Sequence, residues 1–182
     1  LLDLPAGIEF TKSTQVENQT EEFTSLFWAI ATAVFLVFLT MAIQFESPRF
    51  SIVVMISIPF ALIGSFSALM LFGATLSMPS LMGFLMLVGI VVNNGILFID
   101  TANMMRNEQG QSASEALTNA GILRMRPIFM TTLTTILAMV PMAIGLGDNG
   151  EIMRGMALVI IGGLFASTVL TLLLLPSFYL IF

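Results

Sequence analysis

Long apolar runs separated by short polar breaks make up most of this chain. Five of the runs reach the roughly 20 residues that a helix needs to cross a lipid bilayer. They cover about residues 23–45, 50–72, 79–105, 127–146 and 154–182. The pattern therefore predicts an all-α integral membrane protein with five transmembrane helices, in a transmembrane domain that covers residues 23–182.

The polar breaks predict how these helices are connected. Residues 46–49 form a turn that is too short for anything but an antiparallel return. Residues 106–126 form a longer polar segment. Within it we expect a short cytoplasmic interfacial helix with Ser112 or Ser114 as its N-cap, because these hydroxyls can accept hydrogen bonds from the first helical amides. Pro127 then opens the fourth span, since proline suits the first turn of a helix.

Residues 1–22 differ from the rest because they are polar and acidic. They contain a strand-like stretch with a Pro-Ala-Gly turn, followed by a polar lead-in to the first span. We interpret them as the remnant of an extramembrane domain, and we expect the chain to be a piece of a longer protein.

Composition agrees with a location in the bilayer. Hydrophobic residues make up 57% of the chain and charged residues 9%, and the mean hydropathy is +1.01. A soluble domain carries about 25% charged residues. This chain cannot cover a surface that faces water on all sides, so its immediate partner is the lipid bilayer.

Several classes of function are excluded by residue types that the chain lacks. The formal net charge is −5, and no basic patch is present that could bind nucleic acid. The chain has no cysteine and no histidine, which removes thiol chemistry, imidazole catalysis and the usual zinc sites. We find no nucleophile–base pair, so we expect neither an enzyme nor a metal or other cofactor.

The positive charges in the loops predict the orientation of the chain. Cytoplasmic loops of membrane proteins carry an excess of lysine and arginine. The loops on one side hold Arg49, Arg106, Arg124 and Arg126, and the other side holds Arg154 and Lys12. We therefore expect the first side to be cytoplasmic, with the N-terminus outside and the C-terminus in the cytoplasm.

The third run contains two adjacent amides, Asn93 and Asn94, followed by Gly95. Lipid offers them no hydrogen-bond partner, so they must find partners inside the protein. Neighbouring residues on a helix point about 100° apart, which implies two separate contacts or one cavity. The pair is either a hydrogen-bonded contact between helices or a polar patch in a proton or substrate path.

The fourth run carries a stripe of threonines at Thr131, Thr134 and Thr135, which share one helix face. Threonine hydroxyls in membrane helices often bond back to their own backbone. The alternative is a hydrophilic stripe, which together with the two amides would line one polar seam between the third and fourth spans.

Four further residues are candidates with two possible roles each. Arg124 anchors the helix end at the membrane border, or reaches the polar seam if the helix continues through Pro127. Asp100 lies about seven residues after Asn93 and therefore shares its helix face, or it is simply a solvated carboxylate at a helix end. Pro59 and Pro141 lie inside spans, where they act as hinges or simply shape the packing.

Two motifs stand out in the chain, Gly89-Ile-Val-Val-Asn-Asn-Gly-Ile-Leu-Phe-Ile-Asp100 and Arg124-Met-Arg-Pro-Ile-Phe-Met-Thr131. They resemble the resistance-nodulation-division (RND) transporters, in particular their hydrophobe/amphiphile efflux branch. Further similar pieces are Gln44-Phe45-Glu46-Ser47, Ser57-Ile-Pro-Phe-Ala-Leu-Ile-Gly64 and Ile161-Gly162-Gly163-Leu164. Their order is similar to that of the last five helices of the family's second membrane half, and Leu4-Pro5-Ala6-Gly7 resembles the last strand of its periplasmic porter domain.

This resemblance implies a role for the polar residues. In the family, two homologous membrane halves enclose a proton relay, and paired aspartates of the first half titrate. The resemblance places Asn93, Asn94, Thr131 and Arg124 among the relay's partners in the second half. It implies that Asn93 takes the position of a lysine in many relatives, and a neutral amide can form hydrogen bonds but no ion pair.

The resemblance also implies partners and a location. It implies a multi-pass protein of the bacterial inner membrane, an amphiphilic substrate, pairing with the first membrane half, and a homotrimeric full-length transporter. We expect the 182 residues alone to be inactive, and we expect the isolated half to be able to pair with itself. The alternatives are a non-transporting membrane scaffold, or an RND relative that exports lipids or assists protein secretion.

Overall fold

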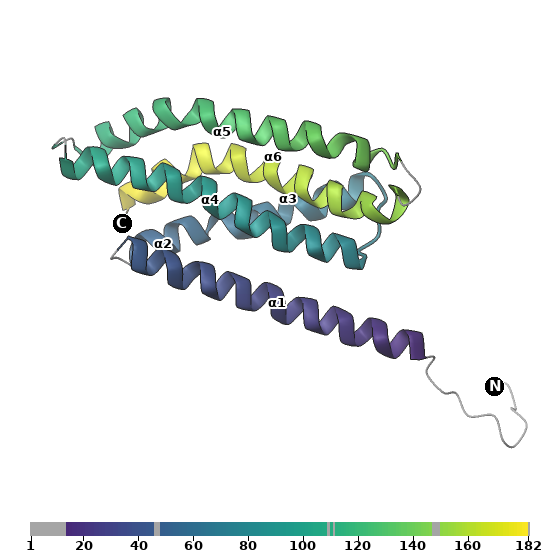
Figure 1. Ribbon diagram of the computed structural model, residues 1–182. Helices are drawn as coiled ribbons and strands as arrows, with labels where there is room; N and C mark the ends of the chain where they lie inside the picture. Colours follow the sequence, from purple (N-terminus) through teal and green to yellow (C-terminus); the bar gives the residue numbers. More distant parts are fainter. Residues whose placement is uncertain (1–13, 46–47, 109, 111, 147–149, 182) are drawn as a thin grey trace, which may run out of the picture.

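In a computed structural model of the chain, residues 14–45, 48–108, 110, 112–146 and 150–181 are described (Figure 1). These residues form a helical bundle and contain no strand. The helices are α1 (Thr14–Gln44), α2 (Pro48–Met55), α3 (Ser57–Leu71), α4 (Met78–Glu108), α5 (Ala113–Ala143) and α6 (Gly150–Ile181). The strand-like stretch predicted near the N-terminus lies outside the described residues.

The prediction of an all-α protein with five transmembrane helices is confirmed. Five segments are long and apolar enough to cross a membrane: Thr20–Gln44, Phe50–Leu71, Met78–Asn107, Ser114–Ala143 and Gly150–Val169. The second of these segments consists of most of α2, Ile56 and all of α3, so six helices of the described chain make five spans.

The second span is divided at Ile56, three residues before Pro59. A proline nitrogen carries no hydrogen, so Pro59 cannot donate to the carbonyl of Met55, and its ring crowds that carbonyl. The helix ends at Met55 and restarts at Ser57 for this reason. The Ser57 hydroxyl donates to the carbonyl of Val54 over 2.6 Å, which satisfies one acceptor at the end of α2.

The polar segment before the fourth span differs from the prediction. It forms a helix, but this helix is not separate, because α5 continues through Pro127 to Ala143. Ser112, one of the two predicted caps, closes a capping box with Glu115: the Glu115 amide donates to Ser112 Oγ over 3.4 Å, and the Ser112 amide donates to Glu115 Oε2 over 3.1 Å. A proline inside an established helix removes one hydrogen bond and leaves the neighbouring turns intact, which a membrane helix tolerates.

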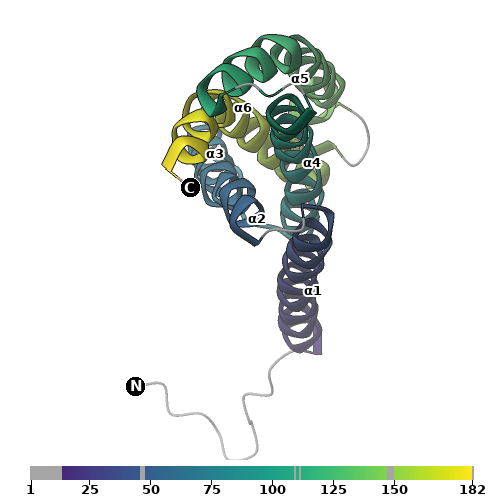
Figure 2. The same cartoon turned by 90° about the vertical axis from the view of Figure 1, so that its left-hand side faces the viewer.

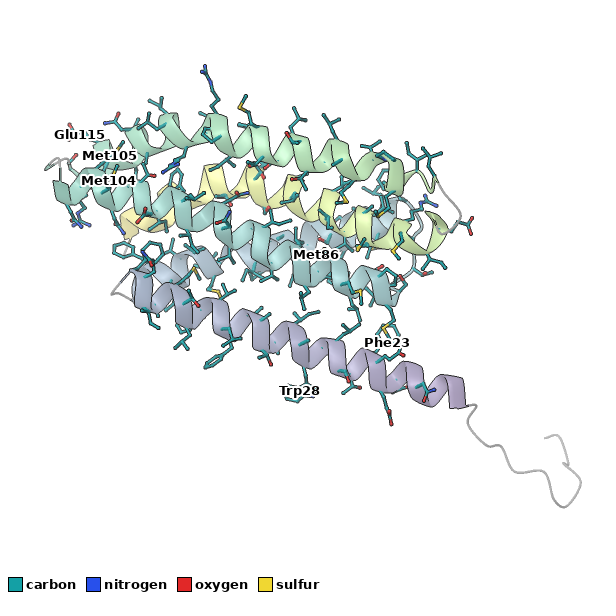
Figure 3. The ribbon with its side chains drawn as sticks, viewed as in Figure 1. Phe23, Trp28, Met86, Met104, Met105 and Glu115 are labelled. Atoms are coloured by element: carbon teal, nitrogen blue, oxygen red, sulfur yellow. The ribbon has the colours of Figure 1, made fainter. Side chains whose placement is uncertain are left out.

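The ends of the helices gather in two groups, one at each end of the bundle. The C-terminal ends of α1, α4 and α6 lie together with the N-terminal ends of α2 and α5 at one end of the bundle, on the left in Figure 1. In Figure 3, Met104, Met105 and Glu115 mark the junction of α4 and α5 at this end. Arg106 lies in the last turn of α4 at the same end.

Helix α6 packs against α3, α4 and α5, whereas α1 lies at the periphery and packs against α4 and α2 (Figures 1 and 2). Trp28 of α1 points away from the bundle and is 66% exposed (Figure 3). Such large apolar side chains suit contact with lipid, which is as apolar as they are.

The contact between α3 and α6 depends on glycine. A Cβ atom added at Gly162 would overlap the Cβ of Ala68 and would lie 2.6 Å from the carbonyl oxygen of Gly64. The backbones of the two helices therefore approach as closely as small residues allow. The Ser65 hydroxyl donates across the same contact to the carbonyl of Val159 over 2.8 Å.

Candidate functional site

The two adjacent amides lie near the middle of α4 and point in different directions. Asn93 is exposed, whereas Asn94 is half-buried. Within the described part of the chain the side-chain amide of Asn93 has no hydrogen-bond partner. Its neighbours Val91 and Val92 are each 2% exposed and face the core. The open face of α4 therefore presents a polar group at a depth where lipid cannot hydrogen-bond with it.

Asn94 faces the inside of the bundle. It lines a narrow crevice between α4, α5 and α6 that has no room for a water molecule. The other residues of the crevice are Val91, Ile128, Ser167, Thr168 and Thr171. The pair thus has two separate environments, one internal and one at the surface of the described chain, as the angle between neighbouring helical residues requires.

The predicted threonine stripe lies on α5, where Thr131 and Thr134 are exposed and Thr135 is half-buried. Their hydroxyls donate to carbonyls of the same helix: Thr131 to Ile128 over 3.0 Å, Thr134 to Met130 over 2.7 Å and Thr135 to Thr131 over 2.8 Å. These bonds are of the back-bonded kind. Among the described residues no hydrogen bond joins the stripe to Asn93 or Asn94, so the common seam stays a prediction.

A different threonine of α5 faces the core. Thr132 is 6% exposed, and its hydroxyl lies 3.1 Å from the hydroxyl of Thr168 on α6. This contact was not predicted from the sequence. The sequence feature that could have indicated this contact is the cluster of Ser167, Thr168 and Thr171 in an apolar run. These residues place hydroxyls on one face of α6, at the level of Asn94.

Arg124 is half-buried and reaches across from α5 to α4. Its Nε donates to the hydroxyl of Thr101 over 2.6 Å. Thr101 is 3% exposed, and its hydroxyl donates in turn to the carbonyl of Leu97 over 2.8 Å. The helix does continue through Pro127, but the side chain of Arg124 contacts Thr101 rather than Thr131. Thr101 is a site residue that the sequence interpretation missed.

The remaining candidates lie apart from one another. Asp100 is exposed on α4, next in sequence to Thr101, and forms no ion pair within the described residues. Pro59 is exposed near the start of α3, and Pro141 is exposed near the end of α5. At the end of the bundle opposite to Arg124, Arg154 Nη2 donates to the carbonyl of Phe72 over 3.2 Å and joins α6 to the end of α3.

These features describe a unit of five candidate membrane spans, with exposed polar side chains at Asn93 on α4 and at Thr131 and Thr134 on α5. A sequence profile of the AcrB/AcrD/AcrF family matches residues 1–182. The chain therefore belongs to this family of RND efflux transporters, and its fold is that of an RND membrane repeat.

Relatives of known name cover nearly all of the chain. It is 37% identical over 181 residues to the multidrug resistance protein MdtC of Erwinia tasmaniensis, covering 98% of this chain and 18% of that protein. It is 37% identical over 179 residues to the swarming motility protein SwrC of Bacillus subtilis, covering 98% of this chain and 17% of that protein.

A solved structure is similar over the same extent. The crystal structure of a heavy metal efflux pump superposes with a TM-score of 0.80 at 31% identity, covering 98% of this chain and 17% of the pump. The chain thus spans less than a fifth of the length of these relatives.

Proposed function

We propose that the chain forms the second membrane half of a proton-coupled transporter that exports amphiphilic compounds. The observation that supports this proposal most directly is Asn93, an exposed amide in the middle of a membrane helix with no partner in the described chain. A polar group at this depth needs a protein or water partner. The homologous first membrane half supplies that partner.

Each candidate then has a separate role in the relay. Asn93 and Asn94 donate and accept hydrogen bonds but cannot change their charge. Arg124 supplies the positive charge near the cytoplasmic end of the path, and Thr131 supplies a hydroxyl whose lone pairs accept hydrogen bonds. The groups that take up and release protons belong to the first half, as in the family that the chain resembles.

The proposed location and assembly follow from the same family. The chain lies in the inner membrane of a bacterium, with its N-terminus outside and its C-terminus in the cytoplasm. Arg106 in the last turn of α4, at the end of the bundle shown on the left in Figure 1, supports this orientation. The complete transporter is a homotrimer, and the chain alone does not transport.

The amphiphile is proposed as the cargo because one relative is named for multidrug resistance. Another relative is named as a heavy metal efflux pump, with a similar fold of this half. Since the two share the membrane half, the cargo is selected elsewhere in the complete protein. The alternative function, that of an RND relative that exports lipids or assists protein secretion, is compatible with the same membrane half.

The test is an Asn93→Leu substitution in the complete transporter, reconstituted into liposomes with a proton gradient. Leucine has a similar volume but makes no hydrogen bond. We expect dye efflux to fall about ten-fold or more, because a hydrogen bond to a charged group contributes about 1.5–3 kcal/mol and about 1.4 kcal/mol corresponds to ten-fold in rate.

The matched control is Thr40→Val on α1, which removes an exposed hydroxyl that donates to the carbonyl of Leu36 over 2.8 Å. Its efflux should stay at the wild-type rate. Wild-type efflux by Asn93→Leu would contradict the relay role, and it would favour a non-transporting scaffold role for this face.

A further inference from the structure

The contact between Arg124 and Thr101 joins α4 and α5 through a buried hydroxyl. Thr101 is 3% exposed, so this hydroxyl must use its hydrogen-bonding capacity within the protein. Its hydrogen is donated to the carbonyl of Leu97, and one of its lone pairs accepts the hydrogen on Nε of Arg124. A threonine hydroxyl offers one donor and two acceptor sites, so both contacts are compatible.

This contact restricts the most flexible charged side chain of the site. Arginine carries about 2 kcal/mol of rotamer entropy, and its guanidinium is a planar group with five donors. A bond at Nε restrains the direction of the Nε–H bond and leaves the two Nη groups free to donate elsewhere. Within the described residues neither Nη of Arg124 has a partner, and the neighbouring carboxylate of Asp100 forms no ion pair with it.

We propose that Thr101 is a positioning residue for Arg124. Its hydroxyl holds Nε against α4 and leaves the two Nη groups free to donate to the titrating carboxylates of the first membrane half. This inference rests on the proposed function, because it assigns the orientation of Arg124 to a residue for which the family resemblance implied no role.

The experiment compares Thr101→Val with Thr101→Ser in the complete transporter, with efflux normalised to the amount of folded protein. Valine keeps the shape of threonine but accepts no hydrogen bond, whereas serine keeps the acceptor. We expect Thr101→Val to lower proton-driven efflux about ten-fold, which corresponds to the loss of one hydrogen bond to a charged group. Thr101→Ser should retain nearly all of the activity.

The matched control is Thr118→Val on α5. Thr118 lies at the same end of the bundle and donates to the carbonyl of Ser114 over 2.9 Å, within its own helix. This variant should transport like the wild type. Should Thr101→Val fail to fold, Thr101→Ala removes the same acceptor with a smaller side chain. An equal loss in Thr101→Ser would indicate a packing role and would overturn the inference.

A spectroscopic readout separates this inference from the proposed function. In transporter with ¹⁵N-labelled arginine, the Nε–H signal of Arg124 is assigned by its absence in Arg124→Lys. This signal should shift in Thr101→Val and stay in place in Thr101→Ser. An unshifted signal, or a shifted signal with wild-type efflux, overturns the positioning role. Wild-type efflux by Arg124→Gln overturns instead the proposed role of Arg124 in the relay.

Discussion

At the scale of single residues, burial separates the threonines of α5 into two kinds. Thr131, Thr134 and Thr135 bond to their own helix, whereas Thr132 bonds to Thr168 on another helix. A hydroxyl that bonds within its own helix does not depend on how the helices pack. A hydroxyl that bonds across a helix contact loses its partner when the helices separate.

This difference predicts unequal effects of the same substitution. Thr132→Val should lower the free energy of unfolding by about 0.6 kcal/mol, the mean for hydrogen bonds between membrane helices. Thr134→Val should leave it unchanged, because its hydroxyl donates to Met130 in α5 itself. Thermal unfolding in mild detergent compares the two variants, and a double-mutant cycle with Thr168→Val isolates the pair. Equal destabilisation by both variants would contradict the cross-helix bond.

The residues of the site could be predicted from the sequence only in part. An amide pair in an apolar run indicates that polar partners are needed, so Asn93 and Asn94 could be identified without a structure. Thr101 and Thr132 could not be identified in this way. Each lies among other polar residues, and the sequence does not show which of them faces a neighbouring helix. Which hydroxyl faces a neighbouring helix depends on how each helix is rotated in the bundle, and apolar residues on every side of these helices leave that rotation undefined.

At the scale of helices, the apolar runs were sufficient to predict five spans but not their internal breaks. Two prolines with the same local chemistry have opposite outcomes: the helix breaks near Pro59 and continues through Pro127. Local rules predict a missing hydrogen bond at both positions. Neighbouring helices and the remaining hydrogen bonds decide whether the helix survives, and these are properties of the packed bundle.

The hinge roles of Pro59 and Pro141 remain predictions.

Glycine at the contact of α3 and α6 leads to a prediction at this scale. Gly162→Ala should destabilise the bundle by about 1–3 kcal/mol, the usual effect of overpacking, because the added Cβ would overlap that of Ala68 and approach the backbone of Gly64. Gly121→Ala on α5 is the control, since its Cβ would meet Phe98 Cε2 at an ordinary 4.0 Å. Thermal unfolding measures both. A Gly162→Ala variant as stable as Gly121→Ala would contradict this prediction, because it would show that α3 and α6 can move apart without a loss of stability.

At the scale of the whole molecule, the exposed amide of Asn93 on α4 supports the proposal that another protein surface covers this face. The core of the described bundle consists mostly of apolar side chains with some buried serine and threonine hydroxyls, and Asn93 lies outside it on the open side. Gly89 precedes Asn93 by one helical turn and is also exposed, and a Cβ added there would meet nothing within 4 Å. A face with a small residue beside an amide suits close approach of a second helix. In the proposed transporter the two halves are parallel repeats, so a second copy of this chain would present a surface similar to that of the first half.

This geometry predicts how the chain assembles. The chain has no cysteine, so Gly89→Cys introduces a single crosslinking position on the open face. We expect two copies of this variant to crosslink when the chain is purified alone in mild detergent, and we expect added first membrane half to suppress that crosslink by occupying the same face. Gly95 is unsuitable for the test, because a Cβ there would lie 2.8 Å from Val54 Cγ1 in the core.

Ile43→Cys on α1 is the control for this experiment, since Ile43 is 71% exposed on the helix at the periphery of the bundle. It should crosslink weakly, and the first membrane half should not change that level. A chain that stays monomeric, or that crosslinks equally at both positions, would contradict pairing through the face of Asn93. A Gly89→Cys dimer that persists in an excess of the first half would mean that the amide face prefers a second copy of itself. The relay partner of the first half would then have to lie on another helix.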